Sequence, residues 1–315
     1  MNPQPKSANC PVCEVVGDGA VVKQLSDRRK GLPGTWDVLE CGNCGALYLD
    51  PMPSDNDLTR YYSEYYSSPK SGELVITAGF GDTNPRLRRV YHWLSGDVDP
   101  RDFVRVPAGG KVLDFGSGGG TYLSYFHSRG IDIIGAEVSE PMLTACLNAG
   151  LKVSRVDSFD TVPFADNEFD VVYLMQVFEH LRNPRQSMQE LARILKPNGS
   201  LYVAVPNASS AWRKIFDRNW VSGWFAPFHL VHYTTDSLSQ LAGESGLRVV
   251  NSWSRTPESW FRLNLKAALR RTDTRLESNP WMLDTMPFRI VLGLLLRIVD
   301  SFHKERDCLM VELVK

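Results

Sequence analysis

Short apolar runs alternate with amphipathic stretches between residues 111 and 206, and glycine or proline ends most of them. Runs of this length and composition are typical of buried strands, and the amphipathic stretches between them are typical of helices. The alternation predicts an α/β fold with a mostly parallel sheet and right-handed crossovers. We expect strands at 111–114, 131–137, 152–156, 170–174, 201–205, 247–253 and 308–314, and helices beginning near 86, 121, 139, 184, 235 and 286.

The first predicted core strand runs directly into a glycine-rich turn. Gly116, Gly118 and Gly120 occupy alternate positions there, and glycine lets a ligand approach the backbone closely. A strand, such a turn and a helix together form the cofactor corner of open α/β sheets. The spacing does not fit the dinucleotide pattern G-x-G-x-x-G, because Thr121 or Leu123 would stand at the last glycine position.

The segment from Asp114 to Gly120 reads Asp-x-Gly-x-Gly-x-Gly, which resembles motif I of the class I S-adenosylmethionine-dependent methyltransferases. Three later segments extend the resemblance over about residues 108–206 in the expected order: 156–172, 176–181 and 193–201. The resemblance implies a Rossmann-like seven-stranded methyltransferase sheet and S-adenosylmethionine as the cofactor.

Glu137 ends the second predicted core strand, where a carboxylate can accept hydrogen bonds from a ribose diol. The resemblance implies that the acidic residue at Asp157 contacts the adenine amino group. We expect the following residues to bind the cofactor: Asp114, Gly116, Gly118, Gly120, Glu137, Val138, Asp157, Ser158 and Gln176.

Methyl transfer to an oxygen needs a base for the acceptor's proton but no acid for the sulfonium, which already leaves readily. Histidine suits this role at neutral pH. His180 follows the fourth predicted strand at the ligand-binding rim, and His229 and His232 precede the helix predicted near 235. We expect His229 to be the base, with His180 and His232 as alternatives, and each could instead be structural. Glu179 beside His180 is also a candidate ligand pair for a divalent cation.

Two CxxC pairs near the start of the chain predict a metal site. They comprise Cys10 with Cys13 and Cys41 with Cys44, and the sequence opens without an apolar export signal. Such pairs indicate metal ligands rather than disulfides. We expect a closed, structural Zn²⁺ site with four thiolates, with a redox or free-thiol pair as the alternative. Flanking strands are predicted at 38–40 and 46–49.

The chain divides into three predicted parts: a zinc-ribbon-like module at 1–53, a helical or linker segment at 54–107 that could form a lid, and the methyltransferase domain at 108–315. Four tyrosines between residues 61 and 66 favour packing of the module on the core over an aromatic cleft. Insertions at 207–233 and 255–306 are expected to form the acceptor pocket.

Each insertion carries a feature with two interpretations. Aromatic residues at 212, 216, 220 and 224 would share one face if that segment were a helix, either for packing or for substrate. Arg262, Lys266 and Arg270 fall on one helix face, which is either solvated or binds a phosphate-bearing acceptor or an anionic membrane. The amphipathic segment 286–302 could pack on the core, form a homodimer or touch lipid.

The net charge of −1 gives no general attraction to nucleic acid. The apolar run Ile290–Leu296 is far too short to span a membrane, so we expect a soluble, cytoplasmic protein. We expect the methyl group to go to an oxygen of a small molecule, namely a sugar, a glycan precursor or a natural product. This expectation follows from the resemblance of a zinc module followed by this core to enzymes of sugar and polysaccharide biosynthesis.

Three other functions are alternatives: C-methylation of a nucleotide sugar, RNA methylation, and a non-enzymatic cofactor-binding or zinc interaction module. RNA base methylation is disfavoured because no Asn-Pro-Pro-Tyr-like motif follows the fourth predicted strand, where the sequence is Leu174-Met175-Gln176-Val177. The intact glycines and Glu137 disfavour the non-enzymatic reading.

Overall fold

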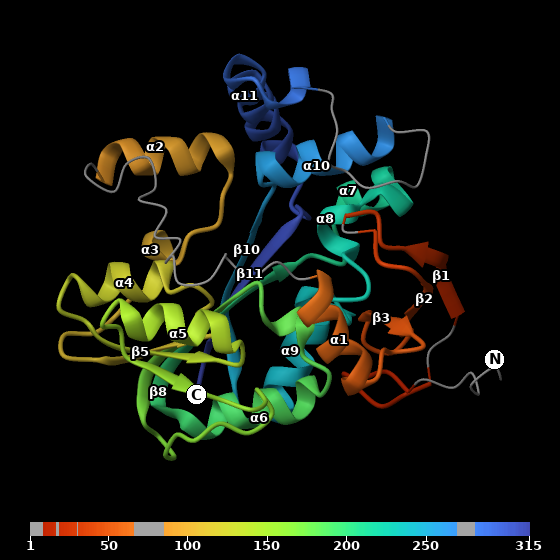
Figure 1. The fold of residues 1–315 in the computed structure, drawn as a ribbon. Helices are drawn as coiled ribbons and strands as arrows, with labels where there is room; N and C mark the ends of the chain where they lie inside the picture. Colours follow the sequence, from red (N-terminus) through yellow and green to blue (C-terminus); the bar gives the residue numbers. More distant parts are fainter. Residues whose placement is uncertain (1–8, 17–18, 30, 66–84, 270–280) are drawn as a thin grey trace.

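Two sheets organise the computed structural model, which describes residues 9–16, 19–29, 31–65, 85–269 and 281–315 (Figure 1). The larger sheet has seven strands in the order β10-β11-β8-β7-β4-β5-β6. Its strands are β4 (Lys111–Phe115), β5 (Asp132–Glu137), β6 (Val153–Arg155), β7 (Phe169–Met175), β8 (Leu195–Pro206), β10 (Arg248–Arg255) and β11 (Cys308–Val314).

The pairing of these strands confirms the expected α/β fold with a mostly parallel, seven-stranded sheet. β4, β5, β6, β7 and β8 pair in parallel, and β11 lies antiparallel between β8 and β10. The largest difference from the predicted strand boundaries is at β8, which begins at Leu195 rather than at Leu201. Leu195 pairs with Phe169 before a shift in register, so Asn198, whose φ is 65°, lies inside the strand.

Helices cover both faces of the large sheet because the chain leaves β4 in one direction to β5 and β6 and later adds β7 and β8 on the other side. Val112 of β4 packs in one apolar cluster with Leu123, whereas its neighbour Leu113 packs in another with Leu191 and Leu238. Successive strand residues therefore face opposite helical layers. The helices are α4 (Thr121–His127), α5 (Glu140–Asn148), α6 (Pro184–Ile194) and α9 (Thr235–Glu244).

The smaller sheet joins the N-terminal part of the chain to the core. Its order is β1 (Gly19–Ser26), β2 (Thr35–Glu40), β3 (Leu47–Asp50) and β9 (Val231–His232). The backbone N–H of Leu49 also donates to the carbonyl of Leu230, at 3.1 Å. The insertion before α9 therefore supplies a strand to the N-terminal sheet, which the sequence alone did not indicate.

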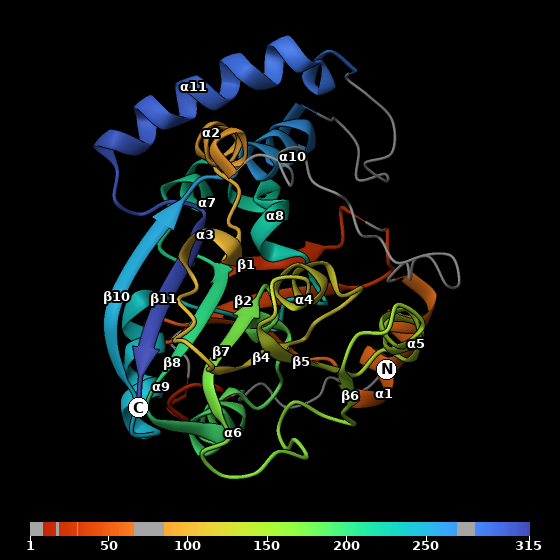
Figure 2. The same cartoon turned by 90° about the vertical axis from the view of Figure 1, so that its left-hand side faces the viewer.

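A third group of helices lies beyond the carboxyl ends of the parallel strands. α11 (Met286–Phe302) crosses over α2 (Pro85–Ser95) and α10 (Glu258–Leu269), as Figure 2 shows. No helix in the described part of the chain is long and apolar enough to cross a membrane. Of the segment 54–107, which was expected to be helical or a linker and a possible lid, residues 66–84 lie outside the described residues. The other helical segments are α1 (Asp55–Tyr65), α3 (Pro100–Phe103), η1 (Phe178–His180), α7 (Ala211–Phe216), η2 (Asp217–Asn219), α8 (Val221–Trp224) and η3 (Trp281–Asp284).

The predicted single aromatic face in the first insertion is wrong. α7 ends at Phe216, and Asp217, with φ of 48°, begins the separate turn η2. Trp212 packs edge-on against Phe261 of α10, whereas Trp224 contacts His232, with ring centroids 5.0 Å apart. The break at Asp217 divides the aromatic residues between two packing environments.

Candidate active site

The glycine turn after β4 is shaped by the protein around it. Gly116, Gly118 and Gly120 have φ values of 81°, 51° and 77°. A Cβ at Gly116 would lie 2.6 Å from Val177, and one at Gly120 would lie 2.8 Å from Cys146, whereas a Cβ at Gly118 would meet no atom within 4 Å. The outer two glycines are therefore required by packing, and the backbone of Gly118 faces open space that a ligand could fill.

Glu137 lies beneath this turn and is held by three backbone N–H groups. Its Oε2 accepts from Gly118 at 2.7 Å, and its Oε1 accepts from Val138 and Ser139 at 2.9 and 2.8 Å. Burial raises the pKa of this carboxyl, although the three hydrogen bonds oppose the shift. A carboxylate oxygen can accept two hydrogen bonds, so Oε2 keeps one acceptor position for a hydroxyl group of a ligand.

Asp114 provides a second buried carboxyl at the same corner. It is 3% exposed, and its Oδ2 has no hydrogen-bond partner among the described residues. Burial raises the pKa of Asp114 to about 7. The buried hydroxyl of Tyr173 lies close enough to act on this pKa. Buried polar atoms are nearly always hydrogen-bonded, so the donor to Oδ2 is either this hydroxyl or a group of a bound cofactor.

The remaining predicted cofactor residues lie at the rim. The side chain of Asp157 is 96% exposed and lies 3.7 Å from the guanidinium of Arg155. Ser158 and Val138 are exposed as well. Gln176 directly follows β7, has a φ of 57° and lines a cavity. These positions surround the carboxyl ends of β4, β5, β6 and β7, where open α/β sheets bind ligands.

That cavity has a volume of about 340 Å³ and opens beside the carboxyl end of β7. Gln176 lines it, as do Asp97, Tyr122 and Trp260, which the sequence reasoning missed. Burial raises the pKa of Asp97. Tyr122 was detectable, because it directly follows the glycine turn. Asp97 and Trp260 come from segments far apart in the chain, and only the fold brings them together.

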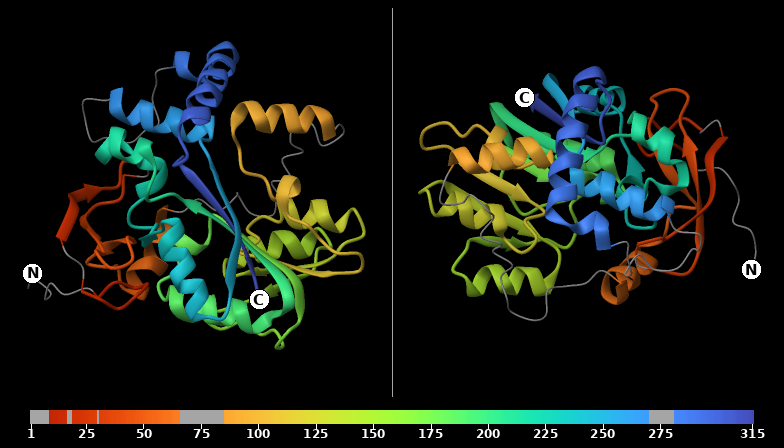
Figure 3. Two further views of the ribbon diagram at one scale, coloured as in Figure 1. Left: turned by 180° about the vertical axis from the view of Figure 1, so that it is seen from behind. Right: turned by 90° about the horizontal axis from the view of Figure 1, so that it is seen from above.

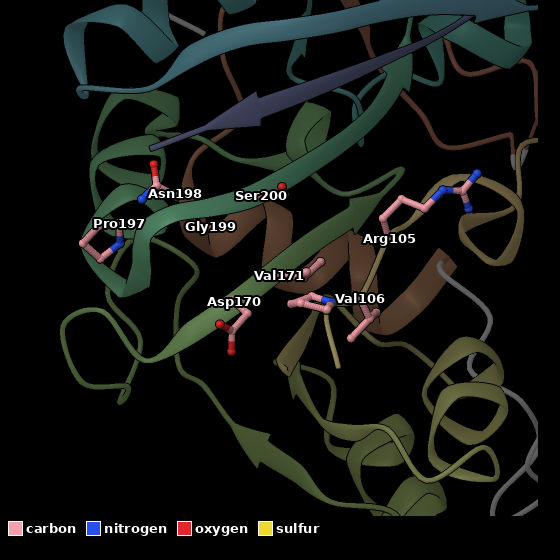
Figure 4. A pocket seen from close by; sticks show the side chains of 9 residues that line it. Arg105, Val106, Asp170, Val171, Pro197, Asn198, Gly199 and Ser200 are labelled. Atoms are coloured by element: carbon pink, nitrogen blue, oxygen red, sulfur yellow. The ribbon is translucent and has the colours of Figure 1, made fainter. Parts of the chain in front are cut away.

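A second cavity, of about 500 Å³, lies at the opposite edge of the sheet (Figure 4). Asp170 at the start of β7 lines it together with Asn198. The Asp170 carboxylate already accepts from the backbone N–H of Lys111 at 2.8 Å and from Lys196 at 2.7 Å. Since ligands of open α/β sheets bind at the carboxyl ends of strands, the smaller cavity is the better candidate.

Two of the three predicted histidines meet just beyond β7. One ligand atom from each of Glu179, His180 and His229 lies within 4.8 Å of the others. The Oε1 of Glu179 is 3.9 Å from the Nε2 of His229, and the hydroxyl of Tyr62 is hydrogen-bonded to the Nδ1 of His180 at 2.9 Å. We call Glu179, His180 and His229 the acid–histidine cluster. Its spacing is compatible with the divalent cation considered from the sequence.

The hydrogen bonds within this cluster define where its protons lie. The Nδ1 of His229 is 2.7 Å from the carbonyl oxygen of Gly223. A carbonyl only accepts, so Nδ1 carries the hydrogen and Nε2 keeps its lone pair. Glu179 is fully buried, neither of its carboxylate oxygens has a partner among the described residues, and burial raises its pKa to about 8. Burial also lowers the pKa of His229 well below its ordinary value.

His232 lies in a different environment. It is fully buried against Trp220 and Trp224, and burial lowers its pKa to about 3. Neither of its ring nitrogens has a partner among the described residues. Its backbone belongs to β9, where it pairs with Leu47. The surroundings of His232 are those of a packed aromatic residue.

The N-terminal part of the chain forms one wall of the acid–histidine cluster. Tyr62 of α1 packs edge-on against Phe228, with ring centroids 5.2 Å apart, and also bonds His180. The guanidinium of Arg29 lies 3.8 Å above the ring of Phe225. The packing interpretation of the tyrosines therefore missed a polar contact that Tyr62 makes within the site.

The four predicted metal ligands converge at one point. The sulfur atoms of Cys10 and Cys44 are 3.6 Å apart, those of Cys13 and Cys41 are 3.3 Å apart, and all four lie within 4.8 Å of one another. A tetrahedral site with Zn–S bonds of about 2.3 Å separates its sulfurs by about 3.8 Å. The hydrogen bond with Cys44 lowers the pKa of Cys10 to about 5, which favours a thiolate there. This donor set fits Zn²⁺.

The basic segment of the second insertion is engaged in ion pairs where it is described. Arg262 bonds Glu258 at 2.8 Å, and Lys266 bonds Asp284 at 2.6 Å. The two cations share a face of α10, as predicted, but each has an acidic partner. Arg270, Arg271 and Arg275 lie outside the described residues.

Comparison with known proteins identifies the class. Residues 96–252 match a family model described as "Methyltransferase domain". The chain is 31% identical over 138 residues to a demethylmenaquinone methyltransferase from Paenarthrobacter aurescens, which is 44% of this chain and 51% of that protein. It is also 31% identical over 144 residues to a ubiquinone biosynthesis O-methyltransferase from Dechloromonas aromatica, which is 44% of this chain and 61% of that protein. Residues 96–252 therefore form a domain of the class I S-adenosylmethionine-dependent methyltransferases.

These matches cover the core of the fold. The chain spans about half the length of the curated relatives described. A solved S-adenosylmethionine-dependent methyltransferase from Archaeoglobus fulgidus is 19% identical, with a TM-score of 0.46 over 82% of this chain and 99% of that chain. The family match begins after the N-terminal sheet and ends within β10.

Proposed function

We propose that this chain transfers a methyl group from S-adenosylmethionine to an oxygen of a small-molecule acceptor. The observation that carries the proposal is the acid–histidine cluster, of which Glu179 and His180 belong to η1, shortly after β7 and the cavity residue Gln176. Relatives named as a ubiquinone biosynthesis O-methyltransferase and a demethylmenaquinone methyltransferase support a small-molecule acceptor.

The cofactor would be held at the glycine turn. The free acceptor position on Glu137 suits a ribose hydroxyl, and the open space over Gly118 suits the approach of the cofactor. Asp157 and Ser158, at the rim, would contact the adenine, and Gln176 would face the reacting end from the cavity. Asp114, with its unpartnered Oδ2, would accept a hydrogen bond from the ligand or from residues that move on binding.

S-adenosylmethionine supplies a methyl group on a sulfonium that leaves readily, so the protein has to position the acceptor and remove its proton. The Nε2 of His229 has the lone pair to accept that proton as the acceptor oxygen bonds to the methyl carbon. Burial raises the pKa of Glu179 to about 8, so its carboxyl, 3.9 Å away, would be neutral before transfer and would ionise and stabilise the imidazolium once that charge forms. The thioether would be the neutral leaving group, the acceptor would keep the methyl group on its oxygen, and His229 would hold the proton.

The N-terminal module would hold a structural Zn²⁺ ion. By folding the module, this ion would support the wall that the N-terminal part of the chain forms beside the acid–histidine cluster. The four thiols meet the geometric requirement, and a closed four-sulfur site leaves no position for a substrate. We propose more narrowly that the acceptor is a hydroxylated sugar, a glycan precursor or a natural product. This choice rests on the resemblance of a zinc module before this core to enzymes of sugar and polysaccharide biosynthesis. No contact among the described residues favours RNA.

Calorimetry with S-adenosylhomocysteine, followed by a methyl-transfer assay on a panel of hydroxylated acceptors, tests the proposal. We expect binding by the folded, zinc-loaded protein and transfer to an oxygen, located by mass spectrometry and NMR of the product. Glu137→Ala should abolish binding while the fold persists. Failure of the folded protein to bind the cofactor would contradict the proposal, and transfer to carbon would correct the acceptor atom.

A further inference from the structure

The cavity beside β7 is bounded mainly by segments outside the glycine turn. Of the residues expected to bind the cofactor, only Gln176 lines it. His92 and Asp97 come from α2 and the segment after it, and Trp260 comes from α10, in the second insertion. Both helices lie at one end of the molecule, beyond the carboxyl ends of the parallel strands (Figure 3). These walls are the ones expected of an acceptor pocket.

A glycine turn after α2 places Asp97 in this cavity. α2 ends at Ser95, and the backbone N–H of Gly96, which has a φ of 68°, donates to the carbonyl oxygen of His92 at 2.9 Å. A Cβ at Gly96 would overlap the carbonyl oxygen of Thr256. The backbone N–H of Asp97 then donates to the hydroxyl of Ser95 at 3.2 Å. Conformation and packing both require glycine at this turn, which fixes where Asp97 enters the wall.

Asp97 differs from the other carboxylate of the lining in lacking a cationic partner. Among the described residues it forms no ion pair. Asp99, by contrast, accepts two hydrogen bonds from the guanidinium of Arg101, at 2.9 and 2.6 Å. His92 is also engaged, because its Nδ1 lies 2.6 Å from the carboxylate of Asp102. The lining therefore keeps one carboxylate whose charge no described cation pairs with.

The charge of Asp97 acts across the cavity. Burial raises the pKa of Tyr122 and that of Cys308, and the negative charge of Asp97 raises both further. These two lining groups are therefore neutral, and the hydroxyl of Tyr122 can donate a hydrogen bond to a ligand. Burial also raises the pKa of Asp97 itself, so a cation bound beside it would favour its charged form.

The lining distinguishes between three kinds of cationic ligand. Asp97 and Asp99 belong to neither of the described groups whose ligand atoms are close enough to share a metal ion. The amino-acid end of the cofactor carries a carboxylate beside its ammonium, and no arginine or lysine of the described lining would receive that carboxylate. A ligand whose only charge is an ammonium meets neither objection. The aromatic rings of Tyr122 and Trp260 also attract such a group.

We propose that this cavity binds the acceptor and that Asp97 receives a protonated amino group of it, so that the substrate class is a hydroxylated amine such as an amino sugar. The inference rests on the proposed function, because it takes the cavity to be the acceptor pocket. An ammonium has no lone pair, so this group positions the acceptor and is not itself methylated. Cys308 links the cavity to the acid–histidine cluster, since it accepts from Gln176 at 3.4 Å and the charge of Glu179 raises its pKa.

Calorimetry on the zinc-loaded protein, with and without S-adenosylhomocysteine, tests the amine site. The probes are pairs of sugars that differ at one position: glucosamine with glucose, galactosamine with galactose, and mannosamine with mannose. We expect an amine to bind about 10- to 100-fold more tightly than its neutral partner, and Asp97→Asn to remove this preference. The matched control is Asp132→Asn, which removes a carboxylate at the start of β5, at the opposite edge of the sheet, and should keep the preference.

The cofactor product separates an acceptor amine from the amino group of the cofactor. Asp97→Asn should bind S-adenosylhomocysteine within about twofold of the wild type. If this variant instead loses affinity for S-adenosylhomocysteine but not for 5′-methylthioadenosine, which lacks the amino-acid end, Asp97 holds the cofactor and the proposal is overturned. A folded wild type that binds no S-adenosylhomocysteine would contradict the proposed function, whereas the amine preference is measured independently of it.

Circular dichroism establishes that each variant is folded before it is compared. Trp260→Leu, on the other wall of the cavity, should also weaken binding of the amine, and it provides the test if Asp97→Asn does not fold. The proposal is overturned if the folded wild type prefers none of the amines to its neutral partner. It is overturned as well if folded Asp97→Asn keeps the preference that the Asp132→Asn control shows.

Discussion

The Nε2 of His229 faces a carboxylate oxygen of Glu179 at 3.9 Å, and both groups are buried. The two side chains come from segments about 50 residues apart, η1 and the insertion before α9. The hydrogen bond from the other nitrogen of His229 to Gly223 fixes the ring so that its lone pair is directed toward Glu179. This pair is the basis of the first two predictions.

Replacing His229 by Asn should lower kcat by about 10²- to 10⁴-fold, the usual contribution of a positioned base. The dissociation constant for S-adenosylhomocysteine should stay the same, because His229 lies outside the glycine turn. Steady-state kinetics and calorimetry measure the two quantities. His232→Phe, at a packed aromatic position, is the control and should retain turnover. Equal turnover by His229→Asn and wild type would eliminate His229 as the base.

Glu179→Gln should also lower kcat, because the amide, unlike the carboxyl group, cannot ionise when His229 becomes protonated beside it. The same assay in the presence of a chelator separates this role from cation binding. We expect wild-type activity to persist when EDTA is present. Loss of activity with EDTA and its recovery with Mg²⁺ or Mn²⁺ would instead place a divalent cation between Glu179, His180 and His229.

The raised pKa of Asp114 predicts a dependence of stability on pH. Its folded-state pKa of about 7 exceeds its ordinary value of 3.8, so between these two values the folded state binds more protons than the unfolded state. Stability contributed by this group is therefore present in acid and is lost as the pH rises toward 7. Asp114→Asn should have a Tm that falls less than that of the wild type between pH 5 and pH 7, in the cofactor-free protein. Parallel falls in both proteins would show that burial of Asp114 is not the cause.

Two glycines of the turn should respond differently to substitution by alanine. Gly116→Ala places a methyl group 2.6 Å from Val177 and should unfold or strongly destabilise the protein. Gly118→Ala meets no atom within 4 Å, so it should fold with a penalty of about 1 kcal/mol for its positive φ. Its affinity for S-adenosylhomocysteine should nevertheless fall. Thermal unfolding and calorimetry distinguish the two effects, and unchanged affinity in Gly118→Ala would remove this backbone from the cofactor site.

Zinc should be found at one ion per chain by elemental analysis of the purified protein. Cys41→Ser should lose the metal and unfold at lower temperature, because a structural site contributes to folding directly. Cys146→Ser, outside the cysteine cluster, should keep its zinc. A wild-type protein that is folded and active without metal would contradict a structural zinc site and favour free thiols.

The core of the fold was predictable because its signals are local. Strand length, glycine stops and the motif spacing located the seven strands, and the glycine turn indicated where a cofactor would bind. β8 begins early because Leu195 pairs with Phe169, a contact between residues distant in sequence. The prediction of a single aromatic face in the first insertion was wrong because Asp217 adopts a positive-φ backbone conformation, which helical periodicity does not reveal.

The residues expected near the acceptor were less predictable, because packing between segments distant in the sequence determines their surroundings. His229 and His232 lie three residues apart in one apolar run, and nothing in that run distinguishes them. In the folded insertion, His229 lies beside Glu179, whereas His232 is buried against Trp220 and Trp224. The hydrogen bond between Tyr62 and His180 depends on where α1 packs, and the sequence of α1 does not indicate this position.

The pairing of β9 with β3 makes the N-terminal module a poor candidate for removal. A fragment that begins at the methyltransferase core would lose the partner of Val231 and His232. It would then expose the backbone of β9 beside a set of tryptophans, and an unpaired strand edge recruits other chains. Truncation at the predicted boundary near residue 107 would therefore yield an aggregating fragment rather than a smaller enzyme, and crystallisation or engineering of the core should retain the first 53 residues.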